Sequence, residues 1–167
     1  MTTNREVSSS FNGQLRVRVC GILFNKGQIL MAQHKPFGPA GELWIPPGGG
    51  MEFGESATEC LVREFKEETN LEVKVGSLLF VHETRRNSIH AIELFFEITH
   101  FSGDVKTGTD PELSSDNQIL RDVKFISQEK INKMPVEMLH NVFNYLKNKE
   151  GLISFESLLR INEKYIS

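Results

Sequence analysis

Apolar and polar positions alternate over residues 15–24, and this period of two predicts a β-strand. A turn follows at residues 25–27, and the apolar run at residues 28–33 is expected to be the hairpin partner of that strand. The preceding residues, 1–14, are polar and are expected to form a flexible tail. The alternating positions are Leu15, Val17, Val19, Gly21 and Leu23 against Arg16, Arg18, Cys20, Ile22 and Phe24.

The best-marked helix is predicted at residues 56–69. Ser56, with Glu59 three residues later, matches a capping box, which satisfies free backbone N–H groups at a helix start. Asn70 can take the left-handed conformation that closes a helix. The segment before this helix, residues 35–50, is rich in glycine and proline and is expected to be irregular for most of its length.

The second half of the chain continues to mix strands and helices. Pro135 opens a predicted helix in which Leu139, Val142, Phe143 and Leu146 share one face. This mixture, without repeats, indicates a single α/β or α+β domain over residues 15–167. The other predicted elements are strands at 72–83 and 90–99, a turn at 84–88, a loop at 102–118, a strand at 123–126 and a further helix at 152–165.

The helix at residues 56–69 breaks its own hydrophobic pattern. At about 100° per residue, Glu64 and Glu68 fall in the middle of the apolar stripe and Glu67 falls at its edge. The stripe itself consists of Ala57, Cys60, Leu61 and Phe65, and the opposite side of the helix carries Glu59, Arg63 and Lys66.

Carboxylates turned toward the interior are costly unless their pKa is raised or a positive charge compensates them. Glu64, Glu67 and Glu68 stand at i, i+3 and i+4, so they can share one or more ions. A cluster of oxygen ligands favours Mg²⁺, with Mn²⁺ as a substitute, over Zn²⁺. The plainer alternative is a solvated glutamate-rich surface helix, which the continuation of the apolar stripe disfavours.

A glycine-rich segment, Gly48 to Glu55, delivers the chain into this helix. Glycine allows the backbone to approach a ligand or a metal closely. Together, loop and helix resemble the Nudix box, which reads Gly, five residues, Glu, seven residues, then Arg-Glu-apolar-any-Glu-Glu-any-Gly-apolar. One position departs, since Asn70 stands where the box has Gly. The matching residues are Gly49, Glu55, Arg63, Glu64, Phe65, Glu67, Glu68 and Leu71.

The resemblance to Nudix hydrolases, the MutT-like family, implies an α/β/α sandwich around a mixed β-sheet. It also implies hydrolysis of a nucleoside diphosphate linked to another group X, with water attacking phosphorus. By the same resemblance, Glu64, Glu67 and Glu68 are metal ligands together with the Gly48 carbonyl. Arg63 orients a box carboxylate, and Glu55 supports the loop or a second metal shell.

Residues outside the carboxylate set are candidates for the remaining roles. Glu112 is the first choice for a general base on a separate loop. Gly49, Gly50, Lys35 and Arg85 are candidates for substrate binding, the last two because cationic side chains can grip phosphate. The histidines at 34, 82, 90, 100 and 140 show no ligand spacing and are expected to be structural or exposed. Phe37 and Trp44 could stack on a base, but Trp44 could equally be a core anchor.

Composition narrows the partners without identifying the substrate. A formal charge of -3 gives no basic face for a nucleic-acid polymer, and the partner is expected to be a small nucleotide or another diphosphate. Cys20 and Cys60 have neither zinc-ligand nor disulfide-framework spacing, which fits a reduced cytoplasmic setting. No membrane anchor is expected, and either a monomer or a homodimer is compatible with the family.

Two functions remain after these exclusions. The first is the enzyme, and the second is a non-catalytic module of the Nudix fold that binds a nucleotide or regulates. The intact carboxylate set favours catalysis. The chain has neither the proline that marks ADP-ribose types, about fifteen residues beyond the box, nor the tyrosine of diadenosine polyphosphate types, so the substrate stays open.

Overall fold

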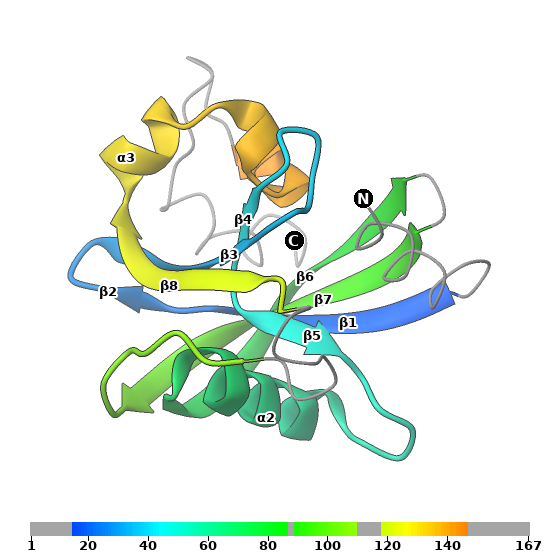
Figure 1. Ribbon diagram of the computed structural model, residues 1–167. Helices are drawn as coiled ribbons and strands as arrows, with labels where there is room; N and C mark the ends of the chain where they lie inside the picture. The colour runs from blue at the N-terminus through cyan, green and yellow to red at the C-terminus, as the bar shows by residue number, and fades with distance from the viewer. Residues whose placement is uncertain (1–14, 87–88, 110–117, 147–167) are drawn as a thin grey trace, which may run out of the picture.

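Two four-stranded β-sheets lie between helices in the computed structural model, which describes residues 15–86, 89–109 and 118–146 (Figure 1). Helix α2 packs on one side of the sheets, while α3 and two 3-10 helices lie on the other side (Figure 1). This is the mixed α/β fold that the sequence predicts. The elements are β1 (Leu15–Ile22), β2 (Phe24–Asn25), β3 (Gln28–His34), β4 (Leu43–Ile45), β5 (Gly48–Gly50), α2 (Ala57–Thr69), β6 (Glu72–Arg86), β7 (Ile89–Ser102), β8 (Leu120–Ser127), α3 (Gln128–Lys133), η2 (Val136–Met138) and η3 (Asn141–Leu146).

One sheet is mixed and the other is antiparallel. The mixed sheet has the order β5-β1-β7-β6, in which β1 runs parallel to β7 and the other pairs are antiparallel. In the second sheet, β3 pairs with β2, β4 and β8. Apolar side chains fill both sides of this framework. On the α2 side they include Leu61, Phe65, Val19, Leu30 and Ile98, and on the side of α3 and the 3-10 helices they include Trp44, Phe95, Ile126, Ile131 and Phe143.

Helix α2 begins and ends as its sequence predicts. The Ser56 side chain accepts the Glu59 N–H, and the Glu59 side chain accepts the Ser56 N–H, which completes the capping box. Asn70 closes the helix with φ 62° and ψ 13°, and its N–H donates to the Lys66 carbonyl. Its side-chain amide also donates to the Asp104 carbonyl at 3.2 Å.

Asn70→Ala is expected to lower the free energy of unfolding by about 1–2 kcal/mol, because alanine is strained in the left-handed region. Asn70→Gly keeps the backbone conformation and is expected to cost less, losing only the contact with Asp104. Urea denaturation of both variants checks this, and an alanine variant as stable as the glycine variant would contradict it.

The predicted hairpin between residues 15–24 and 28–33 is wrong for most of its length. Only Phe24 and Asn25 pair with β3, whereas β1 belongs to the other sheet. The reason is burial: Val19, Cys20 and Ile22 are almost completely buried, so this end of β1 is a central strand that needs a partner on each edge. The predicted turn at 84–88 is also too long, because β6 continues to Arg86 and β7 begins at Ile89.

Residues 35–50 are more regular than their glycine and proline content predicts. Leu43–Ile45 forms β4 on the edge of β3, and Gly48–Gly50 forms β5 on the edge of β1. The apolar β4 residues are buried in the core, which outweighs the local tendency toward a loop. Trp44 is 4% exposed, so of the two roles considered for it, the structure supports the core anchor.

The α-helix predicted from Pro135 is instead two 3-10 segments. Leu139 forms a bridge with Trp44, and the His140 N–H donates to the Trp44 carbonyl at 2.9 Å, so the chain leaves the helical path between η2 and η3. The predicted inward face is nevertheless correct for Leu139, Val142 and Phe143, which are buried. Helix α3 is an element that the sequence pattern does not predict.

Some predictions concern residues outside the described ranges. These are the tail at 1–14, Glu112 and the helix at 152–165. The single domain over residues 15–167 stays a prediction. Within the described ranges, no helix is both long and apolar enough to cross a membrane.

Candidate functional site

Strand β5 brings the glycine loop against helix α2. A side chain on Gly49 would place its Cβ 2.1 Å from Glu64 Oε1, and one on Gly48 would lie 2.0 Å from the Val19 carbonyl oxygen. Gly48 also has a φ of +147°, a conformation that side-chain-bearing residues rarely adopt. The glycines are therefore required for the contact between the loop and the carboxylate face of α2.

Glu68 is the most enclosed carboxylate of the helix. Its exposed fraction is 8%, and its Oε2 accepts the Gly48 backbone N–H at 3.0 Å. The other oxygen, Oε1, lies 3.4 Å from Nε2 of His34 at the end of β3. Glu68 therefore lies at the junction of the helix, the glycine strand and the second sheet.

Arg63 links the remaining carboxylates. Its Nη1 donates to Glu64 at 2.9 Å and to Glu67 at 3.3 Å. Its Nε and Nη2 donate to Glu55 at 2.9 and 3.1 Å, and Nη2 also donates to the Gly50 carbonyl. The helical wheel puts Arg63 on the solvated side, but its side chain is only 27% exposed because it folds back toward these acceptors. This geometry fits the orienting role that the family resemblance implies.

Negative charge at the site is only partly compensated. Burial, followed by the charge of Glu68, raises the pKa of Glu64 to about 7, although Arg63 and Arg18 oppose the rise. An added cation would stabilise the ionised form of Glu64 and lower this pKa. The site therefore has the electrostatic character of a cation-binding site.

Acid is expected to destabilise the fold through Glu55. The hydrogen bond from Arg63 is the main reason that the pKa of Glu55 is lowered to about 2, from 4.5. A lowered folded-state pKa means that this contribution is complete above about pH 4.5 and is lost as the pH falls toward 2. Between pH 5 and 2, the wild type should therefore lose about 1–2 kcal/mol more stability than Glu55→Gln. Equal acid-induced losses in denaturation curves of the two proteins would contradict this.

The predicted substrate-binding residues are not gathered in one place. Arg85 is exposed and lines a cavity of about 410 Å³. Lys35 is paired with Glu42 instead. The Gly50 carbonyl is used by Arg63, and Gly49 lies against Glu64. Besides Arg85, the cavity is lined by His82, Glu83, Thr84, Asn141 and Asn144.

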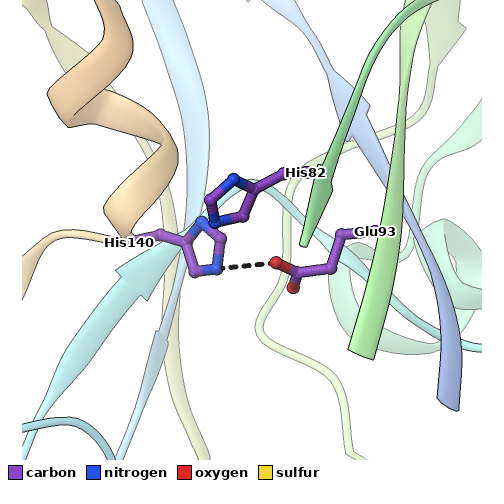
Figure 2. Close-up of side chains that lie close together, drawn as sticks. All are labelled: His82, Glu93 and His140. Atoms are coloured by element: carbon purple, nitrogen blue, oxygen red, sulfur yellow. Dashed lines mark ion pairs between the residues drawn. The ribbon is translucent and has the colours of Figure 1, made fainter. Parts of the chain in front are cut away.

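Two histidines and a glutamate form a cluster that the sequence pattern does not predict. His82 on β6, Glu93 on β7 and His140 just before η3 point toward one another (Figure 2). His140 Nε2 lies 3.1 Å from Glu93 Oε2, and the potential ligand atoms of the three residues all lie within 4.8 Å of one another. The only hint in the sequence is Glu93, a charged residue inside an apolar strand.

Arg18 connects this cluster to the glycine loop. Its Nε lies 3.7 Å from Glu93 Oε1, and its Nη2 donates to the Gly48 carbonyl at 3.3 Å. Burial alone would raise the pKa of Glu93, but His140, Arg18 and Thr84 together lower it to about 2. Glu93 is therefore an ionised carboxylate buried between the two regions.

The box residues suit magnesium with water completing its shell. Their donors are all oxygens, namely the Gly48 carbonyl and three carboxylates. In the part of the chain that the structure describes, these carboxylates do not form one cluster with ligand atoms within 4.8 Å of one another. Arg63 holds Glu64 and Glu67, while Glu68 faces Gly48. Mg²⁺ commonly uses one or two carboxylates and several waters, so this spacing is compatible with it.

Known proteins resemble this chain over most of its length. The NUDIX domain model matches residues 14–143. An ADP-ribose pyrophosphatase from Methanocaldococcus jannaschii is 31% identical over 137 residues, which cover 81% of this chain and 75% of the relative. An mRNA-decapping protein of Variola virus is 30% identical over 71% of this chain, but the match spans only 50% of that protein.

The fold has counterparts among solved structures. The MutT protein of Methanosarcina mazei aligns with a TM-score of 0.64 and 19% identity, covering 92% of this chain and 96% of the other. A structure from Burkholderia pseudomallei, a MutT Nudix hydrolase, aligns with a TM-score of 0.62 and 21% identity over 77% of this chain and 92% of that chain. With the match over residues 14–143, the chain belongs to the Nudix hydrolase family, whose members cleave diphosphate bonds.

Proposed function

We propose that this chain is a magnesium-dependent hydrolase that cleaves a nucleoside diphosphate linked to another group X. The main support is that strand β5 lies against the carboxylates of α2. Glu68 accepts a hydrogen bond from the Gly48 backbone N–H. Bound Mg²⁺ would neutralise phosphate oxygens and lower the pKa of the attacking water. The Gly48 carbonyl, Glu64, Glu67 and Glu68 are the proposed ligands, and Mn²⁺ is the expected substitute.

Arg63 acts through the carboxylates in this proposal. Its guanidinium holds Glu64 and Glu67 from one nitrogen, and Glu55 fixes the guanidinium from the other side. A planar five-donor group suits this task because it can hold several carboxylates in a set geometry. The role is positioning, and Arg63 itself does not contact the reacting phosphate.

Glu112 is the proposed general base. The loop that leads to it is tied to the metal-binding helix, because the Gly108 N–H donates to the Glu68 carbonyl at 2.9 Å. Glu112 follows Gly108 by four positions in the sequence. Glu112→Gln is expected to remove the acidic limb of the pH–rate profile. An unchanged profile would exclude Glu112 and leave Asp110, Asp116 or a box glutamate as the base.

The substrate class is tested with a panel of nucleoside diphosphate derivatives in the presence of Mg²⁺. ADP-ribose leads the panel because the name of the Methanocaldococcus relative specifies it, although the proline marker of ADP-ribose types is missing here. CTP and capped RNA follow, from an Escherichia coli CTP pyrophosphohydrolase and the viral decapping protein. We expect magnesium-dependent release of a nucleoside monophosphate or diphosphate from at least one compound.

The competing function is a Nudix-fold module that binds a nucleotide without cleaving it. For such a module, at least one compound of the same panel would raise the thermal unfolding temperature of the protein, but no product would form with either Mg²⁺ or Mn²⁺. Such a result would overturn the enzymatic proposal while leaving the nucleotide site in place. Glu64, Glu67 and Glu68 are all retained, which supports the enzyme.

A further inference from the structure

We propose that His82, Glu93 and His140 form a second metal site, which binds a divalent transition-metal ion and suits Zn²⁺ best. The three residues come from β6, β7 and the position just before η3, so the site exists only in the folded chain (Figure 2). It is distinct from the magnesium site in position and in ligand chemistry. The proposal does not depend on the proposed function.

The donor set matches zinc and not magnesium. Two imidazoles and one carboxylate, with a fourth position left for water, are typical ligands of Zn²⁺, whereas Mg²⁺ requires oxygen. The proposed ligands in the box are all oxygens, so Mg²⁺ should bind there and Zn²⁺ should prefer the group of His82, Glu93 and His140. Each ion can then be studied while the other site is saturated.

The distances are close to those that an ion needs. With bonds of about 2.0–2.1 Å in a tetrahedron, neighbouring ligand atoms lie about 3.4 Å apart. His140 Nε2 and Glu93 Oε2 are already 3.1 Å apart, and the widest separation in the group is within 4.8 Å. Closing that gap requires a shift of one side chain. His82 is the one placed to move, because it lines the open cavity while Glu93 and His140 are buried.

The cavity provides an entry path. It measures about 410 Å³, and His82 forms part of its wall beside Asn141 and Asn144. An ion arriving through it reaches His82 first and then the buried pair. The same space can hold the water that completes the coordination.

Two neighbours limit the affinity. Nδ1 of His140 accepts the Val142 N–H at 3.3 Å, so Nε2 carries the proton that an ion must replace. When Nε2 binds the ion, the neutral imidazole carries its proton on Nδ1. Nδ1 can then no longer accept the Val142 N–H, and this hydrogen bond is lost. Arg18, 3.7 Å from Glu93, also offsets part of the carboxylate charge. We therefore expect a site weaker than a closed structural zinc site, and one that exchanges its ion.

Histidine-detected NMR of the full chain tests the site directly. The protein is stripped with a chelator, labelled with ¹⁵N-histidine, saturated with Mg²⁺ and titrated with ZnCl₂. One equivalent of zinc is expected to shift the ring signals of His82 and His140 and to leave His90 and His100 unchanged. Zinc that shifts only His34, the neighbour of Glu68, would locate the ion at the box and overturn the proposal, as would no shift at all.

A matched pair of variants gives a second readout. His82→Ala is expected to weaken zinc binding at least about 100-fold, since even outer-shell changes cost 10–100-fold. His90→Ala is the control, because His90 also stands on a strand and pairs with a glutamate, Glu83, but lies outside the group. Zinc should raise the unfolding temperature of the wild type and of His90→Ala, but not that of His82→Ala. Equal zinc affinity in all three proteins would overturn the proposal.

Discussion

Glu68→Gln is expected to lower magnesium-dependent turnover by roughly 10³-fold while the protein stays folded. Gln can still accept the Gly48 N–H with its side-chain oxygen, so the contact that orders the glycine strand survives. The change removes one negative charge from the proposed ligand set. Turnover on the best substrate of the panel, measured over a range of Mg²⁺ concentrations, separates weaker metal binding from a slower chemical step.

The control for this variant is Glu129→Gln. Glu129 also stands on a helix and forms an i, i+4 pair with Lys133, but its side chain is 77% exposed and it lies on α3. It should retain wild-type turnover. If purified Glu68→Gln kept near-normal activity, the assignment of the site to α2 would be wrong.

Gly48→Ala is expected to cost about 3–5 kcal/mol of folding stability, from backbone strain and overpacking together. The Cβ would lie 2.0 Å from the carbonyl oxygen of Val19, and backbone atoms of a central strand cannot move aside easily. The φ of +147° would strain an alanine backbone here even if no atom stood near the added Cβ. Because a domain is stable by only about 5–15 kcal/mol, the variant should lose a large share of its folding stability and unfold at a much lower urea concentration than the wild type.

Gly54→Ala is the matched control for this second prediction. Gly54 also has a positive φ, +88°, but no atom lies within 4 Å of the Cβ that would be added. Only the strain remains, so the expected loss is about 1–2 kcal/mol. Urea denaturation followed by circular dichroism compares the two, and equal losses would show that the close approach to β1 is unimportant.

Features with a local cause could be predicted from the sequence. Helix α2 was predicted at nearly its full length because Ser56, Glu59 and Asn70 mark its ends with short-range hydrogen bonds. The burial of Glu68 followed from the helical period alone. The inward face of residues 139–143 was also correct, since it depends only on which side chains are apolar.

Features decided by distant contacts could not be predicted. The second half of β1 is apolar on both faces, and nothing nearby in the sequence says that β7, some seventy residues later, lies parallel to it. The pairing of Leu139 and His140 with Trp44 likewise changed a predicted α-helix into 3-10 segments. Long-range pairing outweighed local propensity in both cases.

The candidate site divides in the same way. The carboxylates, Arg63 and the glycines belong to one continuous motif, and the structure adds their contacts. The group of His82, Glu93 and His140 draws on three separated segments, so no spacing rule could have found it.

The double attachment of Arg18 has a consequence for mutational scans. Because this guanidinium contacts both Glu93 and the Gly48 carbonyl, a neutral residue at 93 would free it to move toward the acidic helix. The variant would then require a higher magnesium concentration, as if a metal ligand had been lost, although residue 93 lies on β7, outside the glycine loop and α2. A screen that ranks positions by the Mg²⁺ concentration that each variant requires would wrongly assign β7 to the catalytic centre.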